Sequence, residues 1–194
     1  MKLICLSLCV FLIPALCNGS DALHREGNKS ISFSFDGFKV ANYKYGIGGK
    51  YWKNDNIAFT GSIDFVTGTY KSSAVASGSS LTTDQNYHSN QFTIGVERHL
   101  GTSSKVSPYV GGEVLYTTSD STQTSNNESS GESYGVNVIF GVEYSFDQEV
   151  SLGAEYYIGY LKSDNSFTTP NTTQSIKSES FQTGAGALVL SVYY

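Results

Sequence analysis

The stretch of sequence that decides the fold is YGVNVIFGVEYS, at residues 134–145. Its even-numbered residues, from Tyr134 to Tyr144, are all apolar, whereas its odd-numbered residues are mostly small or polar, as Gly135, Asn137 and Glu143 are. Successive side chains of a β-strand point to opposite faces, so a period of two predicts a strand with one apolar and one polar face.

The same alternation recurs along the chain and predicts eight strands. They lie near residues 30–38, 41–52, 57–70, 87–100, 106–118, 133–146, 150–162 and 178–194. Each segment, apart from the marginal first one, reaches the roughly 9–11 residues that a tilted strand needs to cross the hydrocarbon of a membrane. Aromatic residues such as Tyr51 and Tyr144 lie at segment ends, as they do in the interfacial girdles of membrane barrels.

The connections between these segments alternate in length. Tight turns are expected at residues 53–56, 101–105 and 147–149, and long loops rich in Ser, Thr and Asn at residues 71–86, 117–132 and 163–177. Outer-membrane barrels combine short periplasmic turns with long outer loops. The predicted fold class is therefore all-β, an eight-stranded antiparallel up-and-down transmembrane β-barrel with its long loops outside.

Composition indicates which face meets the lipid. The apolar face carries Tyr, Phe, Ile or Val at almost every position, which is too bulky for the interior of an eight-stranded barrel, where side chains already fill the space. The other face is mostly Gly, Ser, Thr and Ala, with a few charges, and fits inside. The alternative is a soluble lipocalin-like carrier, in which the apolar face would point inward.

The first 19 residues are expected to be a signal peptide. Lys2 precedes an apolar run at residues 3–16, and small residues follow near Gly19; this run is shorter than the roughly 20 residues of a transmembrane helix. Residues 20–29 would then be a short polar linker, and residues 30–194 the barrel. The alternative is a lipoprotein acylated on Cys17, although Leu16 stands where that processing prefers a small residue. All three cysteines lie in this leader, so the mature chain would have no disulfide.

Several function classes find no support in the sequence. The net charge of −5 without a basic patch argues against nucleic acid as a partner. No metal-ligand spacing, phosphate loop or nucleophile elbow is present, so neither a metal nor a cofactor is expected. His88 and Ser89 are neighbours on a predicted strand and so point to opposite faces, which prevents a catalytic dyad. We therefore do not expect an enzyme.

Charged residues on the inward face are the candidate site. By parity the lumen receives Lys44, Lys50, Asp64, Glu97, Glu113, Glu143 and Glu155. Buried charges must be paired to be tolerated, so we expect a structural network that plugs the lumen; a gate or proton path is the alternative. Arg98 falls on the lipid face near a turn unless a bulge turns it inward. His99 is expected in the girdle or the lumen.

The last segment carries the most specific signal. Leu188, Leu190, Val192 and Tyr194 alternate toward a terminal aromatic residue, which resembles the signal read by the outer-membrane insertion machinery. Together with YGIGGKYW at residues 45–52, this motif resembles the eight-stranded outer-membrane barrels of the OmpA/OmpX type over residues 30–194.

The resemblance implies a bacterial outer-membrane protein whose partners are membrane lipids, the insertion machinery and a surface ligand bound by the loops. It implies a structural or surface-interaction role, with a narrow channel for small solutes or ions as the alternative. It does not extend to the periplasmic domain of OmpA, so a wall-anchoring role is not implied.

Overall fold

A computed structural model describes residues 26–36, 43–76, 79–101, 105–123, 128–169 and 172–194. The predicted leader at residues 1–19 lies outside the described residues. No helix in these ranges is long and apolar enough to cross a membrane.

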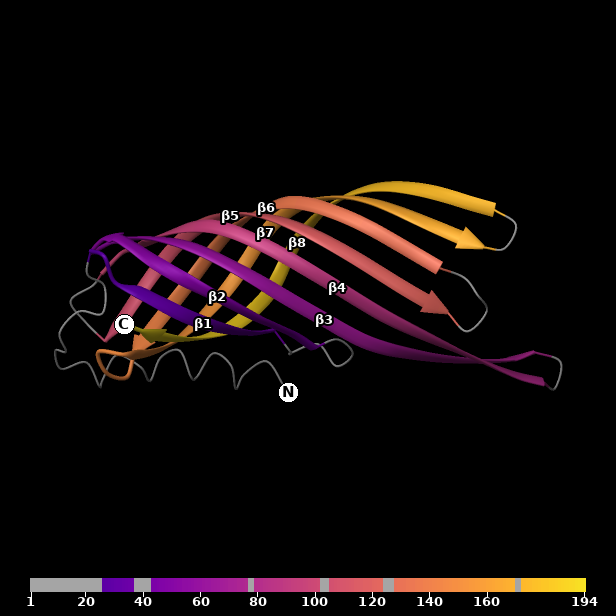
Figure 1. The fold of residues 1–194 in the computed structure, drawn as a ribbon, viewed down its shortest axis with the longest axis horizontal. Helices are drawn as coiled ribbons and strands as arrows, with labels where there is room; N and C mark the ends of the chain where they lie inside the picture. Colours follow the sequence, from indigo (N-terminus) through magenta and orange to yellow (C-terminus); the bar gives the residue numbers. More distant parts are fainter. Residues whose placement is uncertain (1–25, 37–42, 77–78, 102–104, 124–127, 170–171) are drawn as a thin grey trace.

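Eight antiparallel strands close into one barrel, each paired with its neighbours in sequence (Figure 1). They are β1 (Lys29–Asp36), β2 (Tyr43–Asn54), β3 (Ile57–Ala76), β4 (Ser79–His99), β5 (Val106–Gln123), β6 (Glu128–Ser145), β7 (Val150–Thr169) and β8 (Thr172–Tyr193). Pairing of β1 with β8 closes the ring. The predicted fold class is confirmed.

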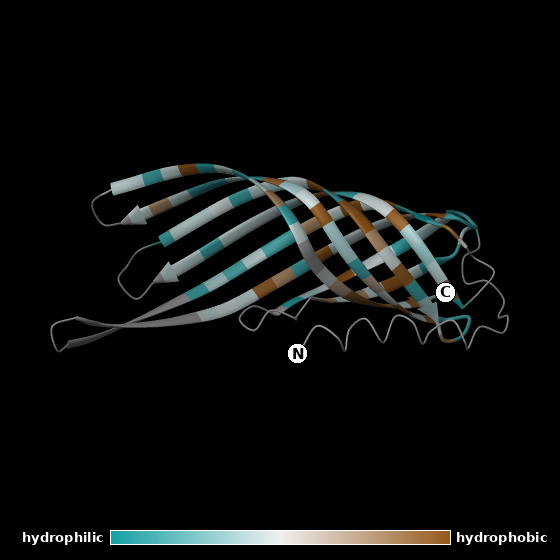
Figure 2. Cartoon of the chain, turned by 180° about the vertical axis from the view of Figure 1, so that it is seen from behind, coloured by the Kyte–Doolittle hydropathy of each residue, from teal (hydrophilic) through white to brown (hydrophobic). Residues whose placement is uncertain are grey.

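The apolar side chains face outward. On β6, Val136, Val138 and Phe140 are all exposed, whereas Ile139 and Glu143 on the same strand are buried in the lumen. Figure 2 shows the hydrophobic residues concentrated over the half of the barrel that contains the C-terminus, while the opposite ends of the strands are mostly pale or hydrophilic. The barrel is thus apolar outside and polar inside, as a lipid environment requires.

The prediction of long outer loops was wrong. Most residues in the three predicted loop segments continue the strands: β3 and β4 stay paired up to Ala76 and Ser79, and β7 and β8 up to Thr169 and Thr172. Strand pairing needs only backbone groups, and these extensions carry Ser, Thr and Asn on both faces. They therefore show no apolar alternation, which was the signal used to define the strands.

The barrel wall is uneven in height as a result. β1 and β2 are short, whereas β3 to β8 extend well beyond them as a protruding sheet (Figure 1). β2 passes to β3 at the other end of the barrel, through Asp55 and Asn56. We call this end the turn end, and the opposite end, where β3 to β8 protrude, the outer end.

Candidate functional site

The lumen at the turn end is filled by a cluster of polar and aromatic side chains, which we call the plug. It consists of Lys50, Trp52, Glu97, His99, Tyr109, Glu143 and Tyr193. These residues come from five strands (β2, β4, β5, β6 and β8), so the plug ties opposite walls of the barrel together. Each of them is at most 6% exposed.

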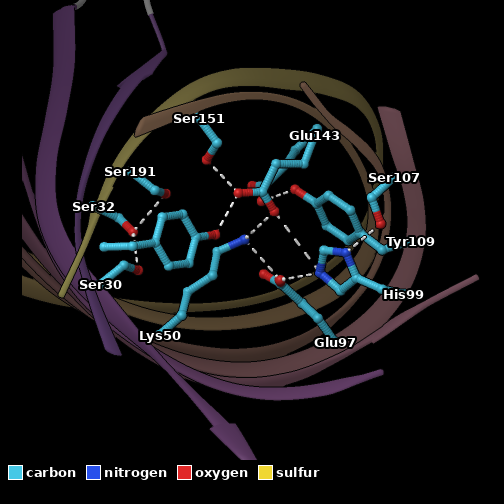
Figure 3. A network of polar contacts seen from close by, with 12 residues as sticks. Ser30, Ser32, Lys50, Glu97, His99, Ser107, Tyr109, Glu143, Ser151 and Ser191 are labelled. Atoms are coloured by element: carbon cyan, nitrogen blue, oxygen red, sulfur yellow. Dashed lines mark hydrogen bonds and ion pairs between the residues drawn. The ribbon is translucent and has the colours of Figure 1, made fainter. Parts of the chain in front are cut away.

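Lys50 is the cation at the centre of the plug (Figure 3). Its Nζ lies 2.8 Å from Oε2 of Glu97 and 3.6 Å from Oε2 of Glu143, and it sits 4.9 Å from the ring centroid of Tyr109. One ammonium thus serves two carboxylates and an aromatic face. Because water is excluded here, these charge-assisted contacts compensate for the desolvation of all three ions.

Neutral groups complete the plug around these charges. The hydroxyls of Ser151 and Tyr193 both donate to Oε1 of Glu143. The His99 ring lies between Trp52 and Tyr109, with centroid distances of 4.6 and 4.7 Å.

The two ring nitrogens of His99 also have polar contacts. Nε2 is 3.3 Å from Glu97 Oε2, and Nδ1 is 2.8 Å from Ser107 Oγ. With its proton on Nε2, His99 donates to the carboxylate and accepts from the Ser107 hydroxyl. Glu97, like Glu143, therefore has polar neighbours besides Lys50.

Above the plug, toward the outer end, the lumen widens into a cavity of about 430 Å³. Its walls carry Lys44, Asp64, Glu113 and Glu155, among many Ser and Thr side chains. Lys44 Nζ lies 3.5 Å from Asp64 Oδ2, which is longer than the closest contact in the plug. This half of the lumen is polar but not filled.

The other two cavity carboxylates have neutral donors. Asn137 Nδ2 donates to Glu113 over 2.7 Å, and the hydroxyls of Tyr109 and Tyr157 both donate to Glu155. Tyr109 therefore belongs to both zones, because its ring packs in the plug and its hydroxyl reaches the cavity wall.

The structure places all seven predicted site residues inside the barrel, but in separate groups. Lys50, Glu97 and Glu143 meet in the plug, Lys44 pairs with Asp64, and Glu113 and Glu155 stand on the cavity wall. Inward parity was correct for each. Which of them touch one another depends on the register between strands.

Sequence reasoning missed Trp52, Tyr109 and Tyr193 of the plug and left His99 open between the girdle and the lumen. His99 and Tyr193 have the same parity as Glu97 and Ser191, which are inward, so parity indicates the lumen for both. Tyr109 could also have been identified, because it pairs with Gly141 on the next strand, where a Cβ would overlap the tyrosine ring. An aromatic residue facing a glycine on the next strand indicates that the ring occupies the space of the missing side chain.

The other residues singled out in the sequence also have clear positions. Arg98 is exposed on the outer face, and its unbroken pairing with Ile57 and Val110 shows no bulge that would turn it inward. His88 is exposed while Ser89 is buried, so the two point to opposite faces.

The four residues of the C-terminal motif alternate with buried neighbours. Leu188, Val192 and Tyr194 are exposed on the outer face and Leu190 is partly exposed, whereas Val189, Ser191 and Tyr193 between them are buried in the lumen.

Over the described ranges, no group of three or more His, Cys, Asp or Glu side chains could hold a metal ion.

Comparison with known proteins agrees with this architecture. The family model described as "Outer membrane protein beta-barrel domain" matches residues 23–187. Among solved structures, the outer membrane protein OprG from Pseudomonas aeruginosa is 14% identical with a TM-score of 0.60, covering 90% of this chain and 98% of that one. No curated protein matches the chain.

The N-terminal β-barrel domain of Pseudomonas aeruginosa OprF is 12% identical with a TM-score of 0.50, and the match covers 91% of this chain and 100% of that domain. At these identities the solved structures support the fold alone. The family match in addition removes the soluble carrier from the alternatives.

Proposed function

The chain belongs to the outer membrane protein beta-barrel domain family, and from this premise we propose that it is a closed structural barrel whose protruding sheet contacts ligands outside the cell. It is a protein of the bacterial outer membrane, where its apolar outer face meets lipid. In the proposed orientation the turn end faces the periplasm and the outer end faces the medium, following the usual arrangement of such barrels.

One observation carries the closed-barrel part of the proposal: Lys50 is buried between Glu97 and Glu143 in the middle of the plug. A solute crossing the lumen would have to separate these ions without replacing their contacts. An eight-stranded barrel is just wide enough for its own side chains. The plug therefore stabilises the barrel and blocks the path through it.

A narrow channel is the second candidate, and the cavity favours it. Its volume of about 430 Å³ leaves room for a small solute in the outer half of the lumen. Conduction would require the plug to rearrange at the turn end. In the closed barrel the same cavity is a dead end above the plug.

Planar-bilayer recording of the refolded barrel tests this choice. We expect no sustained conductance from the wild type, and little from Lys50→Ala, because the aromatic rings of the plug remain. A large, stable wild-type conductance that changes with Glu97→Gln or Glu143→Gln, without any loss of stability, would favour the channel.

Two proposals concern how the protein reaches the membrane. Residues 1–19 would direct export, so N-terminal sequencing of membrane-fraction protein should find a start near Asn18 or Ser20 and not Met1. The outward residues Leu188, Leu190, Val192 and Tyr194 would be read by the insertion machinery. Tyr194→Ser should then lower the folded, heat-modifiable fraction in cells, while refolding in detergent stays unchanged.

A further inference from the structure

The cavity in the outer half of the lumen is closed at its base by the plug. Its lining runs from Lys50 and Glu97, which form its floor, to Ser119 and Ser133 toward the outer end. Its volume of about 430 Å³ lies within the range of roughly 300–1,000 Å³ that is usual for sites that bind small molecules. A small solute can therefore enter from the outer end without disturbing the plug.

The walls of this cavity carry more acids than bases. Lys44 and Asp64 pair with each other, which leaves Glu113 and Glu155. The donors to these two carboxylates are neutral: the Asn137 amide for Glu113, and two tyrosine hydroxyls for Glu155. Within the described part of the chain, neither carboxylate forms an ion pair with a lysine, arginine or histidine. The cavity thus has an excess of two carboxylates.

The plug shows how the same chain holds two carboxylates together. The Lys50 ammonium lies 2.8 Å from Glu97 and 3.6 Å from Glu143, and so serves both. Glu113 and Glu155 also interact electrostatically, but they repel each other because both are anionic. An ammonium group supplied by a ligand would do for them what Lys50 does in the plug. Such charge-assisted hydrogen bonds are strong where the protein partly excludes water.

A second feature of the cavity points to a ligand with a polar group at each end. Ser89 is only 5% exposed and lines the same cavity, yet its hydroxyl has no hydrogen-bond partner among the described residues. It lies nearer the outer end of β4 than Gln91, which contacts Asp64. Buried hydroxyls are normally hydrogen-bonded. A ligand that extends from the two glutamates toward the outer end would supply the missing partner.

We propose that the cavity binds a short primary diamine that enters from the outer end. One ammonium group binds between Glu113 and Glu155, and the other extends toward the outer end and donates to the Ser89 hydroxyl. Two ammonium groups also match the excess of two carboxylates. This inference goes beyond the proposed structural and surface role, and it holds whether or not the lumen conducts.

Calorimetric titration of putrescine into the full barrel tests the inference. Nanodiscs of phosphatidylcholine are suitable because this zwitterionic lipid has no net charge to attract the amine. The wild type should bind putrescine, and Glu113→Gln/Glu155→Gln, which keeps the shape of both side chains, should bind it about tenfold more weakly. Asp120→Asn is the matched control, because Asp120 is an exposed acid on β5, the strand that carries Glu113. It should leave the affinity unchanged.

Probes of the same chain length separate the two ends of the ligand. Butylamine has one ammonium group and should bind more weakly than putrescine, whereas butanediol, which has none, should not bind. Ser89→Ala should weaken putrescine binding about threefold and leave butylamine binding unchanged. Binding of butanediol as tight as that of putrescine would overturn the role of the carboxylates. An unchanged putrescine affinity in Ser89→Ala would overturn the position of the second ammonium group.

A further variant keeps the test decisive if the double variant fails to fold. Asn137→Lys supplies an ammonium group from the wall, beside Glu113 in the same cavity. It should abolish putrescine binding while keeping the urea midpoint of the wild type, and putrescine should raise the midpoint of the wild type alone. Full binding by Asn137→Lys, or equal binding by the wild type and Glu113→Gln/Glu155→Gln, would overturn the proposal. Conductance bears on the closed barrel alone, so the two proposals can fail separately.

Discussion

The two halves of the lumen use the same kinds of residue in different ways. In the plug, Lys50 directly contacts two carboxylates and almost nothing is exposed; in the cavity, Lys44 is 27% exposed and reaches Asp64 at 3.5 Å. Water can replace a lost partner in the cavity but has little access to the plug. Inward parity makes a charge internal, whereas its position along the barrel axis decides how much its partner contributes to stability.

The strongest test of this difference removes one lysine from each half. Lys50→Ala leaves Glu97 and Glu143 without their shared cation, and breaking a buried pair in this way costs about 3–5 kcal/mol. Lys44→Ala should cost less than about 1 kcal/mol, because Lys44 is partly exposed and Ser34 and Gln91 still donate to Asp64. Urea unfolding in lipid vesicles, followed by the fluorescence of Trp52, the single tryptophan, measures both. Equal losses would mean that the two halves do not differ.

The second test compares the inside of the wall with the outside at adjacent residues. Val138 is exposed on the lipid face, whereas the side chain of Asn137 lines the cavity and contacts Glu113. An arginine on the lipid face near the bilayer midplane costs about 2–4 kcal/mol. Asn137→Arg instead places a cation beside a carboxylate in a space with room for it.

We therefore expect Val138→Arg to reduce the folded fraction on heat-modifiable gels much more than Asn137→Arg. Gly135 is a poor internal control, although it also faces inward, because a Cβ there would collide with the Tyr160 carbonyl oxygen. If Val138→Arg folded as well as the wild type, the assignment of the two faces would be inverted.

A smaller effect tests how tightly the plug is packed. A methyl group at Gly141 would overlap the Tyr109 ring, which is itself held against His99. Overpacking of this kind typically costs about 1–3 kcal/mol. Gly101→Ala is the control, because no atom lies within 4 Å of a Cβ there. Gly141→Ala should lower the urea midpoint while Gly101→Ala leaves it in place; an unchanged midpoint for both would show that the plug can rearrange.

The sequence was sufficient to predict the strands in the membrane and the inward orientation of each charged side chain in the lumen. Alternation identifies a strand only where its two faces differ in polarity, as at Phe140 and Gly141. In the protruding part of β7 and β8, Ser163, Ser166 and Ser175 carry no such contrast, so these segments were taken for a loop. Contacts within the plug depend on which rows of neighbouring strands align, which parity alone does not specify. Lys50, Glu97 and Glu143 occupy matching places above their turns in three sequence repeats, which predicted that Lys50 lies near carboxylates. The repeat did not specify the aromatic rings that surround this ion pair.

The last test uses the tyrosine hydroxyls that serve the carboxylates in each half. Tyr193 donates to Glu143 inside the plug, and Tyr157 donates to Glu155 beside the cavity. Replacing either by phenylalanine keeps the ring and removes one donor to a carboxylate, a bond worth roughly 1.5–3 kcal/mol when nothing replaces it.

Tyr193→Phe should approach the lower end of that range, because Ser151 and Lys50 still serve Glu143. Tyr157→Phe should cost under about 1 kcal/mol, because water in the cavity can take over the bond. The urea midpoints of the two variants measure this difference. A greater loss for Tyr157→Phe would mean that the cavity carboxylates, and not the plug, hold the barrel together.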